Sequence, residues 1–361
     1  MSDTSDAENP VGHVVCFLPH ERSAHAAPGQ SVLEAGLAAG LNLPRSCRSG
    51  HCGACCARLL RGRSDYPNGP PLGLSAREAA DGFVLLCQAR ALTDLVVDVR
   101  LVERAQEAQI KTLPCRIERL EHPAPEVARL MLRLPAVERL EFQAGQYLDV
   151  LLEGGRRRSY SIASPPHDAD LLELHVRRVT GGRFSPELFG RREAGSLLRI
   201  EGPFGRLRYQ AAPGPALFIA GGTGFAPIKS MLRVALERGE PRPLQLYWGA
   251  RAAADLYDRE LVEDWVRRRP HFRFQAVVSE GSAATAGPSG LSGNVSAGTS
   301  QAPSRTGFVH EAVLADHPDL SAFTVYAAGP PDMIAAIRAA FPAHGLPAEA
   351  LHLDPFDYAV D

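Results

Sequence analysis

The chain has 361 residues, of which 45% are hydrophobic, and a formal net charge of −2 at pH 7. This length exceeds one average domain, so two or three compact units are expected, and the apolar content gives each of them enough side chains for a core. The net charge gives no electrostatic case for nucleic-acid binding, which requires a concentrated basic face, and the arginines are scattered along the chain. The apolar stretches are too short to cross a bilayer.

The start of the chain and its cysteine content indicate the compartment. Residues 1–9 are polar and acidic, unlike the basic start and apolar middle of a signal peptide. We therefore expect a cytoplasmic protein that contacts no membrane and no nucleic acid. Seven cysteines in a cytoplasmic protein indicate metal or redox chemistry rather than disulfides.

Residues 12–102 are expected to form a small α+β unit with one long, glycine-bearing loop between its strands. Ser31 and Glu34 have the spacing of a capping box, in which each side chain bonds the other residue's backbone N–H, so a helix should begin there. The same spacing returns at Ser75 and Glu78. The strand-like segments are 13–18 and 95–101.

A polar linker near residues 103–112 leads into a strand-rich unit over residues 113–210. Successive strand patterns are separated by turns, with few helical stretches, and this arrangement predicts an all-β barrel. The clearest of these strands are 129–134, 147–152 and 172–177.

Residues 215–361 alternate apolar strands with helical segments, which predicts an α/β domain with a parallel sheet. Residues 281–304 interrupt this pattern with Gly, Ser, Ala and Thr and carry no charge. We interpret them as a flexible surface insertion without readable chemistry. The predicted strands are 216–220, 244–248, 272–278 and 324–328, and the predicted helices include 228–237 and 331–341.

Four of the seven cysteines crowd into ten residues of the first unit. Cys47, Cys52 and Cys55 have the C-x4-C-x2-C spacing of a plant-type 2Fe–2S site, and Cys87 is the candidate for the distant fourth thiolate. Glycines in the loop let the backbone come close, so that amide N–H groups can hydrogen-bond the sulfurs. The alternatives are buried free thiols or a zinc site, although zinc favours paired C-x2-C halves. Cys16, Cys56 and Cys115 are interpreted as packing residues.

The segment Arg158-Ser159-Tyr160-Ser161 stands in the strand-rich unit. It offers an arginine for a pyrophosphate, an aromatic face for a ring, and a hydroxyl within reach of the ring's edge. Strand alternation puts Arg158 and Tyr160 on the same face. Residues 181–185 precede an expected helical turn whose amides and hydroxyl suit an anion. The alternative is an ordinary barrel strand with a solvated arginine.

A glycine-rich turn over residues 221–227 follows the strand 216–220 and opens a helix. Its glycines permit a tight turn, and the helix N-terminus then faces a diphosphate. Such a turn is common among strand-to-helix connections, so by itself it indicates little. Residues 247–251 and 328–333 complete the pattern further along the chain.

Together these motifs carry a family resemblance over nearly the whole chain. Residues 13–102 resemble a plant-type ferredoxin domain. The motifs at 158–161, 181–185 and 202–205 resemble the flavin-binding half of the ferredoxin–NADP reductase superfamily, and the turn at 221–227 resembles its nicotinamide-dinucleotide motif. The domain order is similar to that of reductase components of multicomponent oxygenases and resembles most closely that of CDP-6-deoxy-Δ3,4-glucoseen reductase-like proteins.

The resemblance implies a role for each matched residue. Arg158 would hold the FAD pyrophosphate, Tyr160 would pack against the isoalloxazine, and Ser161 would lie near flavin N5. Tyr160 and Ser161 are thus the candidates closest to the reacting atoms. The other candidates for binding FAD or the nicotinamide dinucleotide are Val176 (through its main chain), Gly182, Ser185, Gly221, Gly222, Thr223, Gly224, Pro227, Arg251, Gly329, Pro330, Met333 and Phe356.

Two positions bear on how the family chemistry would run here. Ala328 stands where most relatives carry a cysteine close to the docked nicotinamide, which affects the expected rate of hydride transfer. Glu280 places a carboxylate where an enzyme for a 2′-phosphate would have a base, so repulsion favours NADH over NADPH, although Arg251 can still accept a phosphate. Phe356 is expected to bring an aromatic ring over the flavin; the alternative is a simply packed C-terminus.

The implied activity is that of an NADH-dependent flavin iron–sulfur oxidoreductase. NADH would give a hydride to FAD, and the 2Fe–2S cluster would pass single electrons to a partner protein. Three hypotheses stay open: the reductase of a sugar-deoxygenating dehydrase, the reductase component of a mono- or dioxygenase, and a redox sensor without turnover. The complete flavin and nicotinamide motifs argue against the sensor. The chain is expected to be a monomer.

Overall fold

The computed structural model describes residues 12–45, 48, 50, 53, 55–71, 73–74, 76–99, 110–168, 171–182, 184–205, 207–210, 212–279 and 304–356. The chain divides into two compact units, Met1–Ala108 and Gln109–Asp361. Each unit has its own sheets and its own apolar core. Over the part of the chain that the structure describes, none of the helices is both long and apolar enough to cross a membrane.

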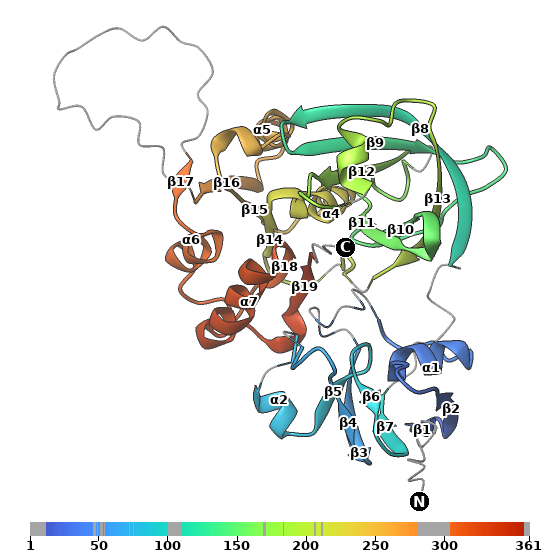
Figure 1. The fold of residues 1–361 in the computed structure, drawn as a ribbon. Helices are drawn as coiled ribbons and strands as arrows, with labels where there is room; N and C mark the ends of the chain where they lie inside the picture. The colour runs from blue at the N-terminus through green and yellow to red at the C-terminus, as the bar shows by residue number, and fades with distance from the viewer. Residues whose placement is uncertain are drawn as a thin grey trace, which may run out of the picture. The chain divides into compact units, whose positions relative to one another are not determined.

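The first unit is built on a five-stranded sheet in the order β2-β1-β7-β3-β5 (Figure 1). Strands β1 and β7 pair in parallel, and the other neighbours pair antiparallel. The core lies between this sheet and helix α1, with Val15, Phe17 and Leu33 almost wholly buried. The elements are β1 (His13–Leu18), β2 (Arg22–Ala26), α1 (Val32–Ala38), β3 (Cys56–Arg61), β4 (Ser64–Asp65), α2 (Ala76–Ala80), β5 (Phe83–Leu85), β6 (Arg90–Ala91) and β7 (Leu95–Asp98).

Helix α1 begins where the sequence predicts because Ser31 caps it. The Ser31 Oγ accepts a hydrogen bond from the Glu34 N–H at 3.2 Å, and the Glu34 carboxylate accepts one from the Ser31 N–H at 2.9 Å. Two backbone donors that the helix leaves without partners are thus satisfied by this capping box. The second predicted box cannot be compared, since Ser75 lies outside the described residues.

The second unit opens with a six-stranded antiparallel sheet in the order β11-β10-β13-β8-β9-β12, which curls into a barrel (Figure 1). The two end strands of this order meet at a bridge between Ile162 and Leu174. Alternate side chains from the strands fill the interior, among them Leu130, Leu148 and Ile200. The elements are β8 (Lys111–Ala124), β9 (Val127–Arg133), β10 (Tyr147–Leu151), β11 (Arg157–Ser161), β12 (Leu171–Arg177), α3 (Phe184–Leu188) and β13 (Leu197–Phe204).

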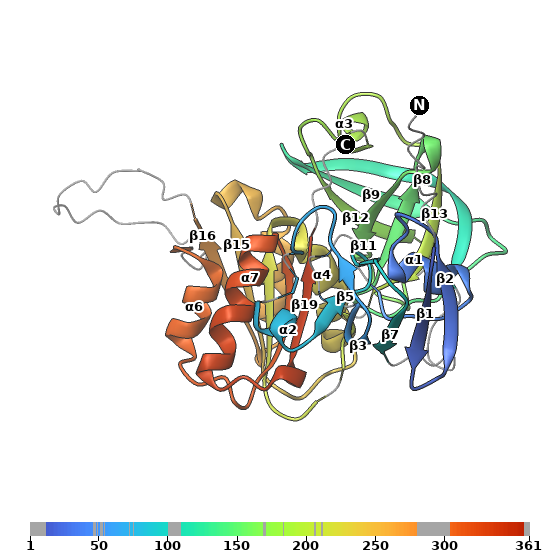
Figure 2. The ribbon, with the colours of Figure 1, turned by 60° about the horizontal axis from the view of Figure 1, so that its bottom comes forward.

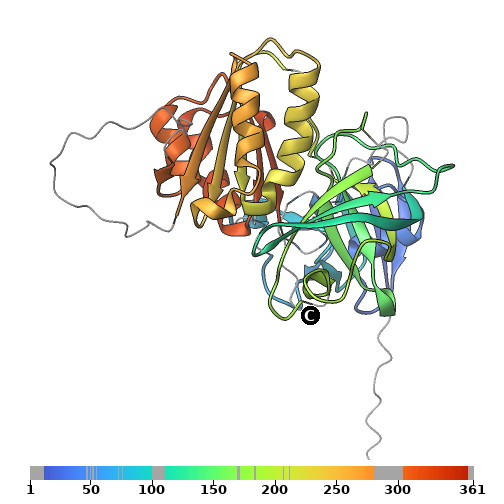
Figure 3. The ribbon, with the colours of Figure 1, turned by 90° about the horizontal axis from the view of Figure 1, so that it is seen from above.

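The same unit continues with a parallel sheet in the order β17-β16-β15-β14-β18-β19. Helices α6 and α7 cover one face (Figure 2), and α4 and α5, the yellow and orange helices of Figure 3, cover the other. The elements are β14 (Ala216–Gly221), α4 (Phe225–Glu237), β15 (Leu244–Ala250), α5 (Arg259–Arg268), β16 (Phe272–Val278), β17 (Arg305–Thr306), α6 (Val309–Asp316), β18 (Thr324–Gly329), α7 (Pro331–Ala340) and β19 (Leu351–Pro355).

The order of this sheet places a topological switch at β14. The chain moves from β14 outward to β15 and β16, and later returns to the other side of β14 to form β18 and β19. At such a switch the connections on the two sides run in opposite directions and leave a crevice at the carboxyl ends of the strands. The glycine-rich turn at the end of β14 opens into that crevice.

The fold class predicted from the sequence is confirmed: an α+β unit, an all-β barrel and a parallel α/β sheet follow each other in that order. Several element boundaries were predicted wrongly. Strand β8 begins at Lys111, which pairs with Gly202, so the end of the predicted linker belongs to the barrel. Helix α4 begins at Phe225 rather than at residue 228, because a proline in the first helical turn, Pro227, is compatible with a helix.

The capping box gives a first prediction. Replacing Ser31 by alanine removes the side-chain cap, which should destabilise the first unit by about 1 kcal/mol and lower its melting temperature by roughly 4–8 °C. Thermal unfolding followed by circular dichroism measures the change. Ser31→Thr keeps a hydroxyl and serves as the control; equal losses in both variants would contradict the capping argument.

Candidate functional site

The first unit brings together two thiols that lie far apart in the sequence. Cys55 precedes β3 and Cys87 follows β5, and both belong to the apolar core. The Cys87 N–H donates a hydrogen bond to the Cys55 Sγ at 3.4 Å, and neither cysteine forms a disulfide. An amide directed at a thiol sulfur is the arrangement that stabilises a thiolate ligand of an iron–sulfur cluster.

The loop around these thiols has the backbone that a cluster loop needs. Gly50 and Gly53 have positive φ angles of 84° and 69°, which a residue with a side chain rarely adopts. A Cβ on Gly50 would lie 2.7 Å from Gln88 Cγ, so the loop packs too closely for a side chain there. The described residues therefore fit a 2Fe–2S cluster. The other two predicted ligands, Cys47 and Cys52, lie outside the described residues.

Two of the remaining cysteines, Cys56 and Cys115, pack against apolar cores. Cys115 is buried in the barrel core, and burial raises the pKa of its thiol to about 12, so it stays protonated. Cys56 begins β3 and packs partly buried against the core of the first unit.

The flavin motif lies on β11, the end strand of the barrel sheet. Arg158 and Tyr160 occupy alternate positions opposite Val150 and Leu148 of β10. The Tyr160 ring meets the Phe184 ring with centroids 5.7 Å apart. Ser161 is buried. The structure thus gathers the predicted arginine, aromatic ring and hydroxyl on one short strand.

Strands β11 and β12 approach each other at the end of the flavin motif through one isolated bridge. The strands are joined by the bridge of Ile162 to Leu174, and the next antiparallel pair would be Tyr160 with Val176. No bridge forms between those two described residues: Tyr160 pairs with Leu148 of β10, and Val176 pairs with Ala128 of β9. The side chain of Val176 points into the barrel core, which agrees with a main-chain role.

The predicted anion-binding turn, residues 181–185, is held by hydrogen bonds to the preceding residue Val179. The Ser185 Oγ accepts a hydrogen bond from the Val179 N–H at 3.0 Å, and the Gly182 N–H donates to the Val179 carbonyl at 3.0 Å. Ser185 is buried at the start of α3. These residues therefore hold a compact turn beside Phe184, which contacts Tyr160 of the flavin motif.

The nicotinamide motif forms the connection between β14 and α4. Gly221 approaches the start of α7 so closely that a Cβ there would lie 2.6 Å from Pro330 Cδ and 2.8 Å from Met333 Sδ. A Cβ on Gly224 would overlap the Ala328 carbonyl oxygen of β18. Glycine is required at both positions because the two strand ends touch. Thr223 is buried in the turn, and Pro227 lies in the first turn of α4.

A cavity of about 400 Å³ opens at this turn. It lies at the carboxyl ends of the parallel strands, where ligands of such sheets bind. Barrel residues such as Arg177 also contribute to its wall. Predicted site residues that line it are Gly221, Gly222, Thr223, Arg251, Pro330 and Met333.

Arg251 of the cavity wall faces a carboxylate. Its Nε lies 3.7 Å from the Asp255 Oδ2, and Asp255 also lines the cavity. Arg251 therefore presents its charge to a ligand only in competition with a neighbouring anion. The other carboxylate expected here, Glu280, lies outside the described residues.

The two cofactor motifs approach each other near the end of the chain. The Ser161 Oγ lies 3.5 Å from the Asp354 Oδ2 at the end of β19. Two residues later the Phe356 N–H donates to the Gly329 carbonyl at 2.8 Å. The flavin strand, the end of β18 and the C-terminal aromatic residue therefore meet at one place, and Asp354 is a site residue that the sequence did not single out.

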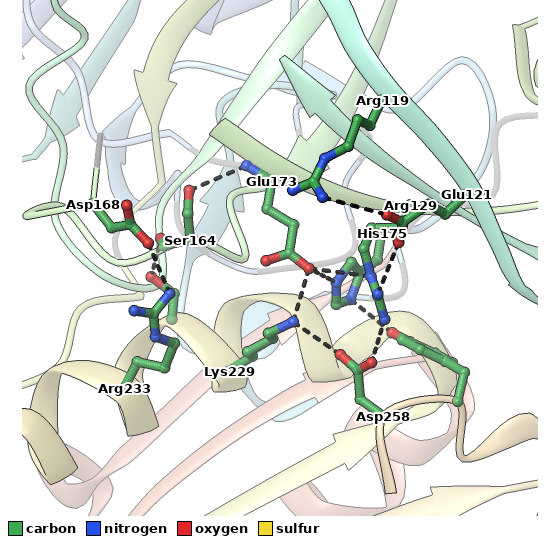
Figure 4. Close-up of polar contacts among 12 residues, drawn as sticks. Arg119, Glu121, Arg129, Ser164, Asp168, Glu173, His175, Lys229, Arg233 and Asp258 are labelled. Atoms are coloured by element: carbon green, nitrogen blue, oxygen red, sulfur yellow. Dashed lines mark hydrogen bonds and ion pairs between the residues drawn. The ribbon is translucent and has the colours of Figure 1, made fainter. Parts of the chain in front are cut away.

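The sequence also missed a buried charge network that joins the barrel to the parallel-sheet domain (Figure 4). The Lys229 Nζ donates to the Glu173 Oε1 at 2.8 Å and to the Asp258 Oδ2 at 2.9 Å. Arg129 pairs with Asp258 and, through its Nε, lies 3.3 Å from the Glu173 Oε1. Strand alternation marks Glu173 and His175 as an outward polar face, but the neighbouring domain covers that face and buries both.

Histidine and tyrosine extend this network to the cavity. The His175 Nε2 lies 2.8 Å from the Glu173 Oε1, and the Tyr257 hydroxyl lies 2.8 Å from the His175 Nδ1. Burial lowers the pKa of His175 despite the carboxylate, so the ring is neutral. Because the carboxylate can only accept, Nε2 carries the proton and Nδ1 accepts from Tyr257, which lines the cavity.

Glu173, His175 and Asp258 are close enough to hold a metal ion. The Lys229 ammonium group already lies between the two carboxylates and donates to both. Two cations, Lys229 and Arg129, balance two carboxylates, so the cluster is an ion-pair network and leaves no charge for a metal to neutralise.

Comparison with known proteins assigns each part of the chain. The family model of a 2Fe-2S iron-sulfur cluster binding domain matches residues 17–92, that of an oxidoreductase FAD-binding domain matches residues 114–209, and that of an oxidoreductase NAD-binding domain matches residues 218–339. The three matches coincide with the thiol loop, the barrel with the Arg158 motif, and the sheet with the glycine-rich turn.

Two curated relatives match almost end to end. The CDP-6-deoxy-L-threo-D-glycero-4-hexulose-3-dehydrase reductase of Yersinia pseudotuberculosis is 36% identical over 90% of this chain and 93% of its own length. Reductase component 1 of the terephthalate 1,2-dioxygenase of Comamonas is 37% identical over 96% of this chain and 98% of its own. The crystal structure of a cytochrome P450 reductase of Amycolatopsis is 33% identical, with a TM-score of 0.71 over 95% of this chain and 98% of that one.

The fold and the site define a three-part electron-transfer oxidoreductase, in which electrons pass from a nicotinamide dinucleotide through FAD to a 2Fe–2S cluster. The chain belongs to the ferredoxin-domain-containing reductases of the ferredoxin–NADP reductase superfamily. The family resemblance read from the motifs is thereby confirmed.

The glycine-rich turn gives a second prediction. Gly222 lines the cavity with a φ of 54°, and Gly239, after the end of α4, has a φ of 67°; a Cβ at either meets nothing within 4 Å. Alanine at either position should cost about 1–2 kcal/mol of backbone strain. Gly222→Ala should in addition raise the Kd for NAD⁺ by roughly tenfold, because its methyl group enters the space of the ligand. Calorimetric titration measures this, and equal Kd values for the two variants would contradict it.

The buried network gives a third prediction, on pH. Burial raises the pKa of Glu173, but His175 and Lys229 outweigh burial and hold the pKa well below its ordinary value of 4.5. A carboxyl group with a lowered pKa stabilises the fold above its unfolded pKa, and this contribution is lost as the pH falls. Glu173→Gln should therefore cost about 3–5 kcal/mol at pH 7, and its deficit should shrink below pH 4.5. Urea unfolding between pH 7 and pH 3.5 measures it; a deficit that stays constant would disprove the assignment.

Proposed function

We propose that the chain is an NADH-dependent reductase that supplies electrons, through its 2Fe–2S cluster, to a separate enzyme component. The observation that carries this proposal is the cavity at the glycine-rich turn, whose wall comes from both the parallel sheet and the barrel. A cavity shared in this way lets a nicotinamide bound by the sheet reach a flavin held by the barrel.

The site residues have the following proposed roles. Arg158 holds the FAD pyrophosphate, Tyr160 packs on the flavin ring, and Ser161 lies at its reacting edge. Val176, Gly182 and Ser185 complete the flavin site. Residues that hold the nicotinamide dinucleotide are Gly221, Gly222, Thr223, Gly224, Pro227, Arg251, Gly329, Pro330 and Met333. Phe356 covers the flavin, and Cys47, Cys52, Cys55 and Cys87 ligate the cluster.

When bound, FAD supplies the conversion of a two-electron donor into single electrons, which the 2Fe–2S cluster can carry. The chain's own residues bind, orient and shield. Ser161 and Asp354 lie within 3.5 Å of each other and hold the flavin strand beside the end of β19. Phe356, anchored through its N–H to Gly329, covers the same place and limits access of water and oxygen.

NADH is proposed as the electron donor in preference to NADPH. A 2′-phosphate would need the charge of Arg251, which Asp255 already faces across 3.7 Å. The added phosphate would also meet the Asp255 carboxylate, and Glu280 in the sequence adds a further negative charge. Repulsion by these acidic side chains disfavours the phosphorylated coenzyme.

The proposed acceptor is a partner protein. The relative from Yersinia is named as the reductase of a hexulose dehydrase, and the relative from Comamonas as the reductase of a dioxygenase. We propose a dehydrase as the acceptor, because the ferredoxin domain and the C-terminal part of the chain resemble those of the CDP-6-deoxy-Δ3,4-glucoseen reductase-like proteins. The alternative acceptor is the oxygenase of a multicomponent system. The third hypothesis, a sensor without turnover, is disfavoured by the cavity, since sensing needs no hydride donor.

Three further features belong to the same proposal. We propose that the chain acts as a cytoplasmic monomer. Its ferredoxin domain would span residues 12–102, its flavin domain 113–210 and its nicotinamide domain 215–361, with 281–304 as an insertion.

A fourth prediction tests the donor. Anaerobic titration of the purified protein with NADH should bleach the flavin absorption and raise the reduced-cluster signal in low-temperature EPR spectra. In steady-state assays, the kcat/KM for NADPH should be at least roughly tenfold lower than the kcat/KM for NADH. Asp255→Asn, which keeps the side-chain shape without its charge, should narrow that difference because it frees Arg251 for a phosphate.

The outcomes separate the hypotheses. A flavin that is reduced while the cluster stays oxidised would contradict the proposed electron path. A protein that neither coenzyme reduces would favour the sensor. Co-purification from the native host, followed by mass spectrometry, should recover a dehydrase; an oxygenase component would support the alternative instead.

A further inference from the structure

Helix α4 is attached to the barrel along one of its faces. The Lys229 Nζ bonds the Glu173 carboxylate at 2.8 Å, and the Ser230 Oγ donates to the Ser164 carbonyl at 2.7 Å. One turn further on, Arg233 pairs with Asp168 across 3.1 Å, as Figure 4 shows. Lys229 and Ser230 are buried, whereas the contact of Arg233 is partly exposed. The buried end of this attachment is the end nearest the glycine-rich turn.

The turn cannot move independently of α4. Phe225, the first residue of the helix, stacks on Trp248 with ring centroids 4.0 Å apart. The Trp248 Nε1 donates to the Gly222 carbonyl at 3.0 Å. Because Lys229 follows Phe225 by one helical turn, a shift of its side chain relative to the barrel displaces the glycines that line the cavity.

The barrel partners of α4 are likewise attached to the flavin strand. The Glu173 N–H donates to the Ser164 Oγ at 3.1 Å, and the Glu173 carbonyl accepts from the Ala163 N–H at 2.8 Å. Ala163 and Ser164 follow Ser161, the last residue of β11, after the single residue Ile162. The Lys229–Glu173 ion pair, beside the Ser230–Ser164 hydrogen bond, is therefore a buried connection between the segment that bears the flavin motif and the helix that bears the nicotinamide motif.

We propose that Lys229 and Glu173 are positioning residues for hydride transfer: their buried ion pair, held by Asp258 and Arg129, fixes the nicotinamide turn against the flavin strand. This inference rests on the proposed function and adds residues outside the cofactor motifs to its machinery. The ion pair contacts neither cofactor motif itself and acts through α4 on one side and through β12 on the other.

An ion pair suits this task better than apolar packing does. Apolar side chains slide past one another at small cost, whereas a buried ammonium group that leaves its carboxylates is unpaired in a low-dielectric interior. Here Lys229 bonds two carboxylates and Arg129 meets the same two, so one arrangement satisfies all four charges. Displacement of α4 relative to the barrel therefore lengthens several of these contacts at once.

Charge-removing and charge-conserving variants of the full-length holoprotein test the proposal. Lys229→Met keeps the length of the side chain without its charge, and Lys229→Arg keeps the charge. The double variant Lys229→Met with Glu173→Gln removes both charges, so it leaves no unpaired charge and should recover the stability that the single variant loses. Arg267→Met, at an exposed ion pair on α5, is the control for removing a cation.

Stopped-flow reduction by NADH separates positioning from binding and from stability. Lys229→Met should lower the limiting rate of flavin reduction by about 10- to 100-fold, the effect of a small misplacement of reacting groups, with less than about a threefold change in the Kd for NAD⁺. Lys229→Arg should restore most of the rate. The double variant should melt near the wild-type temperature and yet stay slow, because the ion pair is gone and the contacts that remain, such as the Ser230–Ser164 hydrogen bond, fix the turn less tightly.

A second readout needs no turnover. Hydrogen–deuterium exchange of the nucleotide-free protein should be faster in Lys229→Met and in the double variant over residues 225–237 and 171–177, and unchanged in Arg267→Met. A double variant with the wild-type reduction rate would overturn the proposal and leave the network a purely structural role. Failure of NADH to reduce the wild-type flavin would instead refute the proposed function, so the two failures are distinguishable.

Discussion

The close approach of β14 to β18 is the constraint on which the site depends. Gly221 and Gly224 lie where any Cβ would overlap the start of α7 or the end of β18. Because the two strand ends touch, the helices that follow them, α4 and α7, begin side by side at one edge of the sheet. The crevice of the topological switch thereby becomes a narrow cavity lined by backbone, which is the surface that a dinucleotide requires.

The second constraint is that this cavity must face a cofactor held by a different sheet. Two separate sets of contacts between the barrel and the parallel sheet satisfy this constraint. The Ser161–Asp354 contact and the Phe356–Gly329 hydrogen bond join the sheets near the reacting edge. The buried network around Lys229 joins them behind the glycine-rich turn. Two separated attachments define an orientation that a single hinge-like contact would leave free.

The sequence predicted what depends on local spacing and missed what depends on the approach of distant segments. The Ser31 box and the strand from Phe272 to Val278 are local features, and they were predicted correctly. Glu173 and His175 alternate with apolar residues along β12 and therefore resemble a solvent-facing row, which only a covering domain can bury. Lys229 on an apolar helix was the available signal, since a lone lysine on a buried face needs a partner.

The position of the two described thiols has a consequence for how the protein matures. Cys55 and Cys87 are part of the apolar core of the first unit, beside Leu85 and Leu86. Ligands that lie far apart in the sequence meet only once the core that joins them has formed, so acquisition of the cluster and consolidation of the unit are coupled. Chains synthesised under iron starvation should therefore have a less stable first unit and a folded second unit. Proteases of the cell would then cleave such chains within the first unit.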